Sequence, residues 1–308
     1  MTHPAVTPPS DTVDSARTRV YSVTHTTTYR YAQPVSQSTH HFRLRPDQDR
    51  FQDVLEHELT TSVPGIQREF EDVFGNQAVH FTITQPYTEL RVEARSVVQV
   101  HSGGGIVGGA TLPRRTSIPI AWMPWQHQMM LPYLLPPELP ESELHELSDY
   151  AREFVERNGH DLTDTLLDLN RALHHQIAYV PGVTHLETTP FEVFRNQRGV
   201  CQDFANLLIC LARLERVPAR YRAGYLHTGG AYENQIQSEA SHAWVEVYLP
   251  WQGWKGLDPT NGLFTDLDHI RVATGRNYRD ATPTSGVVTG GGTEELDVSV
   301  RVEVLEEG

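Results

Sequence analysis

The sequence predicts an α+β protein, in which an N-terminal antiparallel β-domain precedes a core of helices packed on an antiparallel sheet. Residues 19–100 are rich in threonine, tyrosine and valine, and apolar and polar side chains alternate clearly from Leu90 to Val100. Residues 141–215 instead carry apolar side chains at helical spacing. Short β-like runs return after Pro218. This change of period along the chain defines the fold class.

Composition narrows the class of protein. The 308 residues suffice for one large or two ordinary domains, and 38% hydrophobic with 21% charged residues is typical of a globular chain. The formal net charge of −14 disfavours nucleic acid and anionic membrane surfaces as partners. No run of 18 apolar residues is present, so we expect no transmembrane helix. The oligomeric state stays open.

The N-terminus and the cysteines indicate the compartment. Residues 1–18 are polar and lack the apolar stretch of a secretory signal, so we expect a disordered lead-in. Cys201 and Cys210 do not form a disulfide framework, and on one helix they would lie about 13 Å apart. The cytoplasm is therefore the expected location.

The β-domain is expected over residues 19–112. Pro34 is expected to end its first strand, and Gly75-Asn76 suits a two-residue hairpin turn. A proline-rich linker follows over 113–140. The predicted strands are Val20–Tyr31, Thr39–Leu44, Val54–Val63, Glu69–Phe74, Ala78–Thr84 and Leu90–Val100.

The core is expected over residues 141–275. Its first helix should end at Asn158-Gly159, and its second should begin near Thr163. Thr189-Pro190-Phe191-Glu192 reads as the capping box of a short third helix, and a fourth helix is expected over 201–215. The strands that follow are Arg220–Tyr225, Ala243–Leu249 and Gly253–Leu257.

The C-terminal part is less regular. Residues 266–290 show no clear pattern. The segment 276–308 is expected to be an extension that contains a strand near residues 296–304, where valines alternate with polar residues. The sequence does not reveal which sheet this strand joins.

Cys201 is the first candidate for chemistry. It follows a glycine turn at Gly199 and opens the helix expected over 201–215. Unpaired N–H groups and the positive end of the helix dipole favour the thiolate, which is the nucleophilic form. By itself, however, the same cysteine could equally be a small buried hydrophobic residue.

Two downstream stretches supply partners for a thiol nucleophile. Ser241-His242-Ala243-Trp244 places a histidine at the start of one strand, and Leu257-Asp258-Pro259 places an aspartate at the end of the next. In an antiparallel pair these positions are neighbours, with roughly 5 Å between backbones. His242 could take the thiol proton, Asp258 could orient the imidazole, and the N–H of Cys201 could stabilise an oxyanion.

These blocks resemble the core of the transglutaminase-like superfamily. Gly199–Ala205, Ser241–Val247, Gly253-Trp254 and Leu257–Asn261 follow the order Cys, His, Asp, with spacings of 41 and 16 residues. The region from Tyr21 to Val100 is similar to the β-domain that precedes this core in a bacterial transglutaminase-like cysteine protease family. The resemblance implies a papain-like core with the catalytic triad Cys201, His242 and Asp258.

Further residues are weighed beside the triad. Gln202, Tyr225 and Trp244 are candidate substrate contacts, and Trp244 is expected first of all to pack on the sheet as a wall of the site. Asp203 is expected to be a structural carboxylate in the first helical turn, and Cys210 a packing residue. The histidine pairs His40-His41 and His174-His175 match no zinc-ligand spacing, so no metal or cofactor is expected.

The sequence therefore predicts a cysteine-dependent acyl-transfer enzyme. It would act on peptide or isopeptide amides of a peptide or protein substrate through a thioester. Hydrolysis by a peptidase or amidase is favoured, protein-glutamine transglutaminase activity is the alternative, and a non-catalytic peptide-binding module is a third reading. No cluster of calcium ligands is recognisable.

Overall fold

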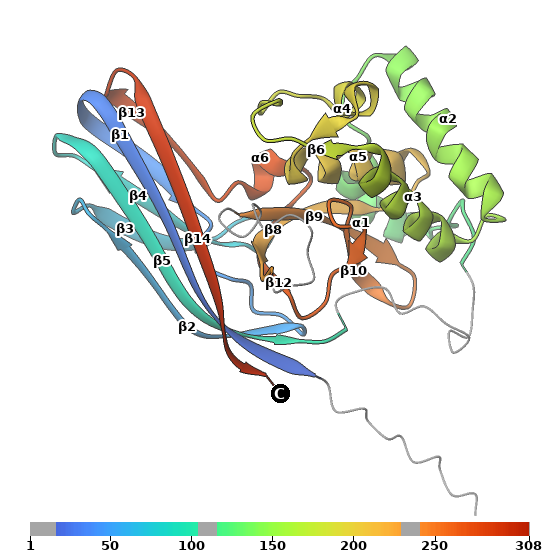
Figure 1. Ribbon diagram of the computed structural model, residues 1–308, viewed down its shortest axis with the longest axis horizontal. Coiled ribbons are helices and arrows are strands. Elements are labelled where there is room, and N and C mark those ends of the chain that lie inside the picture. The colour runs from blue at the N-terminus through green and yellow to red at the C-terminus, as the bar shows by residue number, and fades with distance from the viewer. Residues whose placement is uncertain (1–16, 104–115, 229–240, 308) are drawn as a thin grey trace, which may run out of the picture.

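A sheet of long antiparallel strands lies beside a layer of helices that covers one face of a second, shorter sheet (Figure 1). Figure 1 shows the computed structural model of the protein, which describes residues 17–103, 116–228 and 241–307. The predicted α+β class, with its N-terminal antiparallel sheet, is confirmed. Almost all of the predicted lead-in, 1–18, lies outside the described residues.

The N-terminal sheet has seven strands, and the long strand β1 lies at its centre. The pairing order is β2-β5-β1-β4-β3, and β13 and β14 also pair with β1. The C-terminal strand therefore returns to the N-terminal sheet, where Leu296 lies opposite Tyr29. The strands are β1 (Thr18–Phe42), β2 (Gln52–Thr61), β3 (Ile66–Glu71), β4 (Gln77–Ile83), β5 (Tyr87–His101), β13 (Thr284–Gly290) and β14 (Glu294–Glu307).

The prediction that Pro34 ends the first strand is wrong. β1 continues through it to Phe42, so the strand predicted at Thr39–Leu44 is the second half of the same element. The pairing of β1 with β5 shifts between Arg30 and Val35, so Pro34 lies where a missing N–H breaks no regular ladder bond. Its carbonyl still accepts the N–H of Gly291.

The expected two-residue turn at Gly75-Asn76 is also wrong. The strands β3 and β4 pair up to Glu71 and Gln77, which leaves five residues in the turn. The Asp72 carboxylate closes this turn by accepting the backbone N–H groups of Phe74 and Asn76. Side-chain capping by aspartate therefore decides the turn length, while Gly75 supplies the positive φ of +84° that the turn needs.

The second sheet belongs to the core, and its strand order is β11-β10-β9-β8-β12. A short parallel pair, β6 with β7, lies beside the start of α5. The core elements are α2 (Glu141–Arg157), α3 (Leu162–Gln176), β6 (Ala178–Tyr179), α4 (Pro190–Asn196), β7 (Arg198–Gly199), α5 (Cys201–Leu214), β8 (Ala219–Leu226), β9 (His242–Leu249), β10 (Gly253–Asp258), β11 (Leu263–Phe264), β12 (His269–Gly275) and α6 (Tyr278–Ala281).

Helix α5 is the centre of the core. It packs on β8 and β9 with its inner face and is surrounded by α2, α3 and α4 (Figure 1). The stripe of apolar residues predicted from the sequence faces inward: Phe204, Leu207, Leu208 and Leu211 are buried, and Leu214 at its end is partly buried. The predicted capping box of α4 is confirmed, with reciprocal bonds between Thr189 and Glu192. Burial on all sides fixes the helix that begins at Cys201.

Helix α1 (Pro124–Leu134) and strands β12 and β13 are the largest elements that were not predicted; the short elements β6, β7, β11 and α6 were also missed. Helix α1 lies inside the stretch expected to be a linker, and its first residue is a proline, which suits the start of a helix. Strands β12 and β13 lie in the stretch 266–290 that shows no pattern. β12 escaped prediction because all seven of its residues are buried, including His269 and Arg271, so no apolar and polar alternation is visible.

Candidate active site

The thiol of Cys201 lies at the first residue of α5. Val200 caps the helix in an extended conformation, and its N–H donates to the Asp203 carboxylate over 2.7 Å. The hydroxyl of Thr184 donates to the same oxygen of Asp203, also over 2.7 Å. Asp203 is therefore the structural carboxylate that was predicted, and it holds the turn in front of the thiol.

Gly199 is required for a different reason than a special backbone angle. A Cβ atom at this position would lie 2.8 Å from both Cβ and Oδ2 of Asp203. The glycine thus lets the capping carboxylate pack directly against the chain before the helix. Burial raises the pKa of Asp203, while the N–H of Val200 and the hydroxyl of Thr184 oppose that rise.

His242 and Asp258 meet as the sequence predicted. His242 is the first residue of β9 and Asp258 the last of β10, and these strands pair antiparallel up to Val245 and Leu257. Nε2 of His242 donates to Oδ2 of Asp258 over 2.8 Å, and both side chains are fully buried. The ring therefore directs its other nitrogen, Nδ1, away from Asp258 and leaves it for another partner.

The thiol of Cys201 also acts on this imidazole, because it contributes to the proton affinity of the ring. Burial acts to lower the pKa of His242, but the charge and hydrogen bond of Asp258 and then the interaction with Cys201 raise it to about 10. No hydrogen bond of regular geometry reaches Nδ1 among the described residues. Thiol–imidazole contacts often tighten only when substrate binds. Cys201, His242 and Asp258 thus form one electrostatic unit.

Five hydrogen bonds from donors in the described part of the chain hold Asp258. Oδ1 accepts the N–H groups of Thr260 and Asn261, at 3.0 and 3.2 Å. Oδ2 accepts His242, the Asn261 side chain at 2.7 Å and Nε2 of His269 at 3.2 Å. Burial acts to raise the pKa of Asp258, but the two imidazoles hold it well below the usual range. The carboxylate is therefore ionised and fixed in orientation.

His269 was missed by the sequence analysis. It is the first residue of β12, and nothing in the local pattern marked that strand. The only available signal was a histidine after an Asp-Leu-Asp run, which by itself is ordinary. Only the assembly of the sheet shows that its ring reaches the same carboxylate as His242.

The three proposed substrate contacts fare differently. Trp244 is fully buried and packs against the rings of His242 and His269, with centroids 6.0 and 5.2 Å apart, so its packing role is confirmed and its substrate role is wrong. Tyr225 is also buried, and its hydroxyl contacts His25 of β1 instead of an open cleft. Gln202 is partly exposed in the first turn of α5, and its role stays a prediction.

The second cysteine is inert packing, as predicted. Cys210 is fully buried in α5, and burial raises the pKa of its thiol to about 12. Cys201 is only partly buried. A reagent that needs a thiolate would therefore react with Cys201 alone.

One group of side chains in the described part of the chain has the composition of a metal site. The ligand atoms of His242, Asp258 and His269 lie within 4.8 Å of one another. Both imidazoles already donate protons to the carboxylate, so an ion would have to displace those protons first. The arrangement is accounted for as a hydrogen-bonded network.

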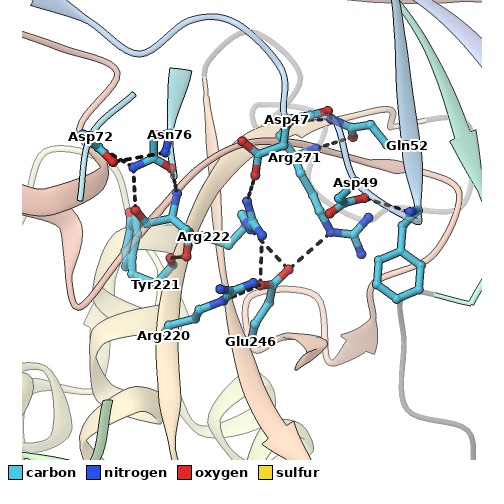
Figure 2. A network of polar contacts seen from close by, with 12 residues as sticks. Asp47, Asp49, Gln52, Asp72, Asn76, Arg220, Tyr221, Arg222, Glu246 and Arg271 are labelled. Atoms are coloured by element: carbon cyan, nitrogen blue, oxygen red, sulfur yellow. Dashed lines mark hydrogen bonds and ion pairs between the residues drawn. The ribbon is translucent and has the colours of Figure 1, made fainter. Parts of the chain in front are cut away.

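The face of the core sheet opposite α5 carries a buried ionic network (Figure 2). Glu246 of β9 accepts Arg220 at 2.7 Å, Arg222 at 3.1 Å and Arg271 at 3.2 Å. Burial acts to raise the pKa of Glu246, but the three guanidinium groups lower it strongly. Arg222 also pairs with Asp47 of the N-terminal domain. The network ties three strands of the core sheet together.

A second set of bonds in the same region joins the two domains. The amide of Gln52 exchanges hydrogen bonds with the backbone of Arg271, at 2.7 and 2.8 Å. Asn76 does the same with Thr274, at 2.8 and 2.7 Å. Both partners lie on β12, whose first residue is His269. The N-terminal domain therefore braces the strand that reaches the triad carboxylate.

A thiol at a helix start, a buried histidine and an oriented aspartate define the class of cysteine-dependent acyl-transfer enzymes. Family comparisons agree with this class. Residues 21–99 match the family "Bacterial transglutaminase-like N-terminal region", and residues 148–259 match the family "Transglutaminase-like superfamily". The chain belongs to the transglutaminase-like superfamily, as the sequence motifs predicted.

Several individual proteins are similar to the chain. An uncharacterized protein of Mycobacterium tuberculosis is 32% identical over 305 residues, which is 94% of each chain. A protein-glutamine gamma-glutamyltransferase of Pseudomonas aeruginosa is 36% identical over 98 residues, which is 30% of this chain and 14% of that protein. A crystal structure from Cytophaga hutchinsonii, provisionally described as a cysteine protease, shares the fold with a TM-score of 0.71 at 21% identity, covering 94% of this chain and 91% of that one.

Among the described residues, no helix is both long enough and apolar enough to cross a membrane.

Proposed function

We propose that the protein hydrolyses peptide or isopeptide amides through a thioester on Cys201. The observation that carries this proposal is the pairing of a partly exposed thiol at the start of α5 with a buried His242 whose other nitrogen is held by Asp258. A binding module would have no use for an ionised carboxylate buried behind an imidazole, because such a group is costly to desolvate.

Each step of the reaction is assigned to a residue of the site. The thiolate of Cys201 attacks the amide carbonyl, and the N–H of Cys201 at the helix start stabilises the oxyanion that forms. The C–N bond breaks as the imidazolium of His242 gives its proton to the leaving amine, which leaves a thioester. Water then attacks the thioester, with neutral His242 taking its proton, and releases the acid and the thiol.

Transglutaminase activity is the second candidate. It would begin with the same thioester, but an amine would replace water as the acceptor. The similarity of 98 residues to a protein-glutamine gamma-glutamyltransferase favours this alternative. The triad does not distinguish the two outcomes, because the choice of acceptor depends on the surroundings of the thioester.

The experiment offers glutamine-containing and isopeptide-linked peptides with and without a labelled primary amine, and follows the products by mass spectrometry. Release of the acid alone supports hydrolysis, and incorporation of the label supports transglutamination. Cys201→Ala should abolish either activity, whereas Cys210→Ala, a matched change of the buried cysteine, should retain it. Turnover that survives Cys201→Ala would overturn the proposal for both acceptors.

A further inference from the structure

Two imidazoles share one carboxylate oxygen in the active site, and the acyl-transfer mechanism uses only one of them. Oδ2 of Asp258 accepts His242 at 2.8 Å and His269 at 3.2 Å, and all three side chains are buried. His269 does not contact Cys201 through any hydrogen bond that the structure describes. A second buried histidine on the triad carboxylate is thus a feature that the chemistry of the thiol does not explain.

The strand order and register of the core sheet bring this second imidazole to the carboxylate. In the order β11-β10-β9-β8-β12, the strand that carries His269 lies three positions from the strand that carries Asp258. On β8, Gly224 pairs with His242 and Leu226 pairs with His269. Gly224 has no space for a side chain, because a Cβ atom would lie 2.4 Å from the Trp244 ring. The glycine lets Trp244 pack beneath both histidines.

The protonation of His269 follows from its two ring nitrogens. Nε2 must carry a hydrogen, because its partner Oδ2 belongs to an ionised carboxylate that only accepts. Nδ1 is buried and has no partner among the described residues. His242 is held protonated by its surroundings in spite of such an unpaired Nδ1, but at His269 burial outweighs the carboxylate, so Nδ1 is unprotonated and the ring is neutral. Burial lowers the pKa of His269, which agrees with this neutral form.

We propose that His269 is a positioning residue of the triad, which donates Nε2–H to Asp258 and withholds part of the carboxylate's negative charge from His242. A neutral donor on Oδ2 makes that oxygen a weaker proton acceptor. His242 then keeps its proton less tightly and gives it more readily to the leaving amine. This role rests on the proposed function, because it tunes the proton transfer of that same reaction.

Other groups near the site do not take over this role. Asn261 also donates to Oδ2, but its amide does not titrate and it comes from the turn that follows β10. The titratable groups that act on the pair are Cys201 from α5 and the carboxylate of Asp268, next to His269. Four donors remain on Asp258 without His269. The carboxylate would stay oriented, so the loss of His269 changes the proton affinity of the carboxylate more than its position.

The test uses the full-length protein and the pH dependence of Cys201 alkylation by iodoacetamide. In this reaction the thiolate sulfur forms a C–S bond and expels iodide, so the rate reports the thiolate fraction. His269→Leu removes the donor, and we expect the alkylation midpoint to move down by about one pH unit, because the imidazolium partner becomes more stable. We also expect kcat at neutral pH to fall about threefold with KM unchanged, since His242 releases its proton less readily.

Two further variants separate tuning from general loosening. His269→Gln keeps an N–H donor, and its midpoint should remain at the wild-type value. His40→Leu, a change of a buried histidine in the N-terminal sheet, should leave the midpoint unchanged. Loosening of the site would instead move the midpoint of His269→Leu upward, toward that of a free thiol. A midpoint that stays or rises in folded His269→Leu, or a shift of the same size in His269→Gln, overturns the proposal.

If His269→Leu does not fold, a measurement on the wild-type protein tests the proposed protonation state of His269. Nitrogen-15 NMR of the histidine rings should show His269 neutral at pH 7, with its proton on Nε2. A ring protonated on Nδ1 would overturn the proposal. Both readouts are independent of turnover. If no amide substrate reacts but the alkylation midpoint shifts as expected, the proposed function fails while the role of His269 in the triad stands.

Discussion

Replacing Asp258 by asparagine isolates the charge of the triad carboxylate. Among the residues that the structure describes, the partners of Asp258 are donors: two backbone N–H groups face Oδ1, and His242, Asn261 and His269 face Oδ2. The amide NH₂ of asparagine would therefore face other donors in either orientation. This clash between donors is relieved only if an imidazole presents an unprotonated ring nitrogen, which accepts, to the amide NH₂. For His242, this change moves the ring proton to Nδ1, on the side of the thiol, where it can no longer accept.

The magnitude follows from the proton affinity of His242. Asp258 and Cys201 together raise the pKa of this histidine from 6.5 to about 10 against the effect of burial. Without the carboxylate charge most of that rise is lost, and each pH unit is a tenfold change in the equilibrium. We expect the equilibrium constant for forming the thiolate–imidazolium pair to fall by about 10³. The loss of kcat/KM should be about 10³ to 10⁴, as in other triads that lose this charge.

The assay is again alkylation of Cys201 as a function of pH, combined with turnover of the best amide substrate. The alkylation midpoint of Asp258→Asn should rise above that of the wild type, because the imidazolium that supports the thiolate is lost. Asp297→Asn, on the exposed face of β14, is the matched control and should behave as the wild type. A folded Asp258→Asn protein with an unchanged midpoint would refute the reasoning, because the carboxylate charge would then not support the imidazolium.

Three further predictions concern stability. Gly199→Ala brings a Cβ to 2.8 Å from Asp203, so we expect the free energy of unfolding to fall by about 1–3 kcal/mol, and an unchanged urea midpoint would contradict this. Glu246→Gln leaves buried guanidinium groups without a counter-charge and should cost about 3–5 kcal/mol, with exposed Glu295→Gln as the control in the same denaturation series. The folded-state pKa values of Glu246 and Asp258 are lowered, so their contribution is complete above about pH 4.5 and is lost on acidification. The thermal midpoint should fall steeply below pH 4, and a midpoint constant down to pH 3 would exclude this linkage.

The local sequence pattern was sufficient to predict those elements in which the apolar and capping residues lie close together in the chain. The stripe from Phe204 to Leu211 predicted α5, and the capping residues Thr189 and Glu192 predicted α4, because these signals lie within one turn or one face of a helix. β12 gave no such signal. Its charged residue Arg271 is buried only because Glu246, on β9, neutralises it. A residue whose partner is distant in the chain cannot be recognised as buried from its neighbours.

The same contrast holds for the candidate site. The order and spacing of Cys201, His242 and Asp258 predicted the triad, because two consecutive strands and one helix start are enough to place these residues at one site. The substrate assignments of Tyr225 and Trp244 failed for the opposite reason. Which face of a central strand is open depends on what packs against it, and here the N-terminal domain and the two histidines do so.

By itself, the sequence determined the class of fold and the helix that presents the thiol, and it predicted the meeting of His242 with Asp258; the catalytic roles of Cys201, His242 and Asp258 stay predictions. Each of these depends on short-range patterns or on one antiparallel pairing. Only the tertiary structure showed that His269 reaches the carboxylate of Asp258, and that the N-terminal domain braces β12 through Gln52 and Asn76. His269 reaches Asp258 because the order of the core sheet brings their strands to the same site. Gln52 reaches Arg271, 219 residues away in the chain, because the N-terminal part packs against β12.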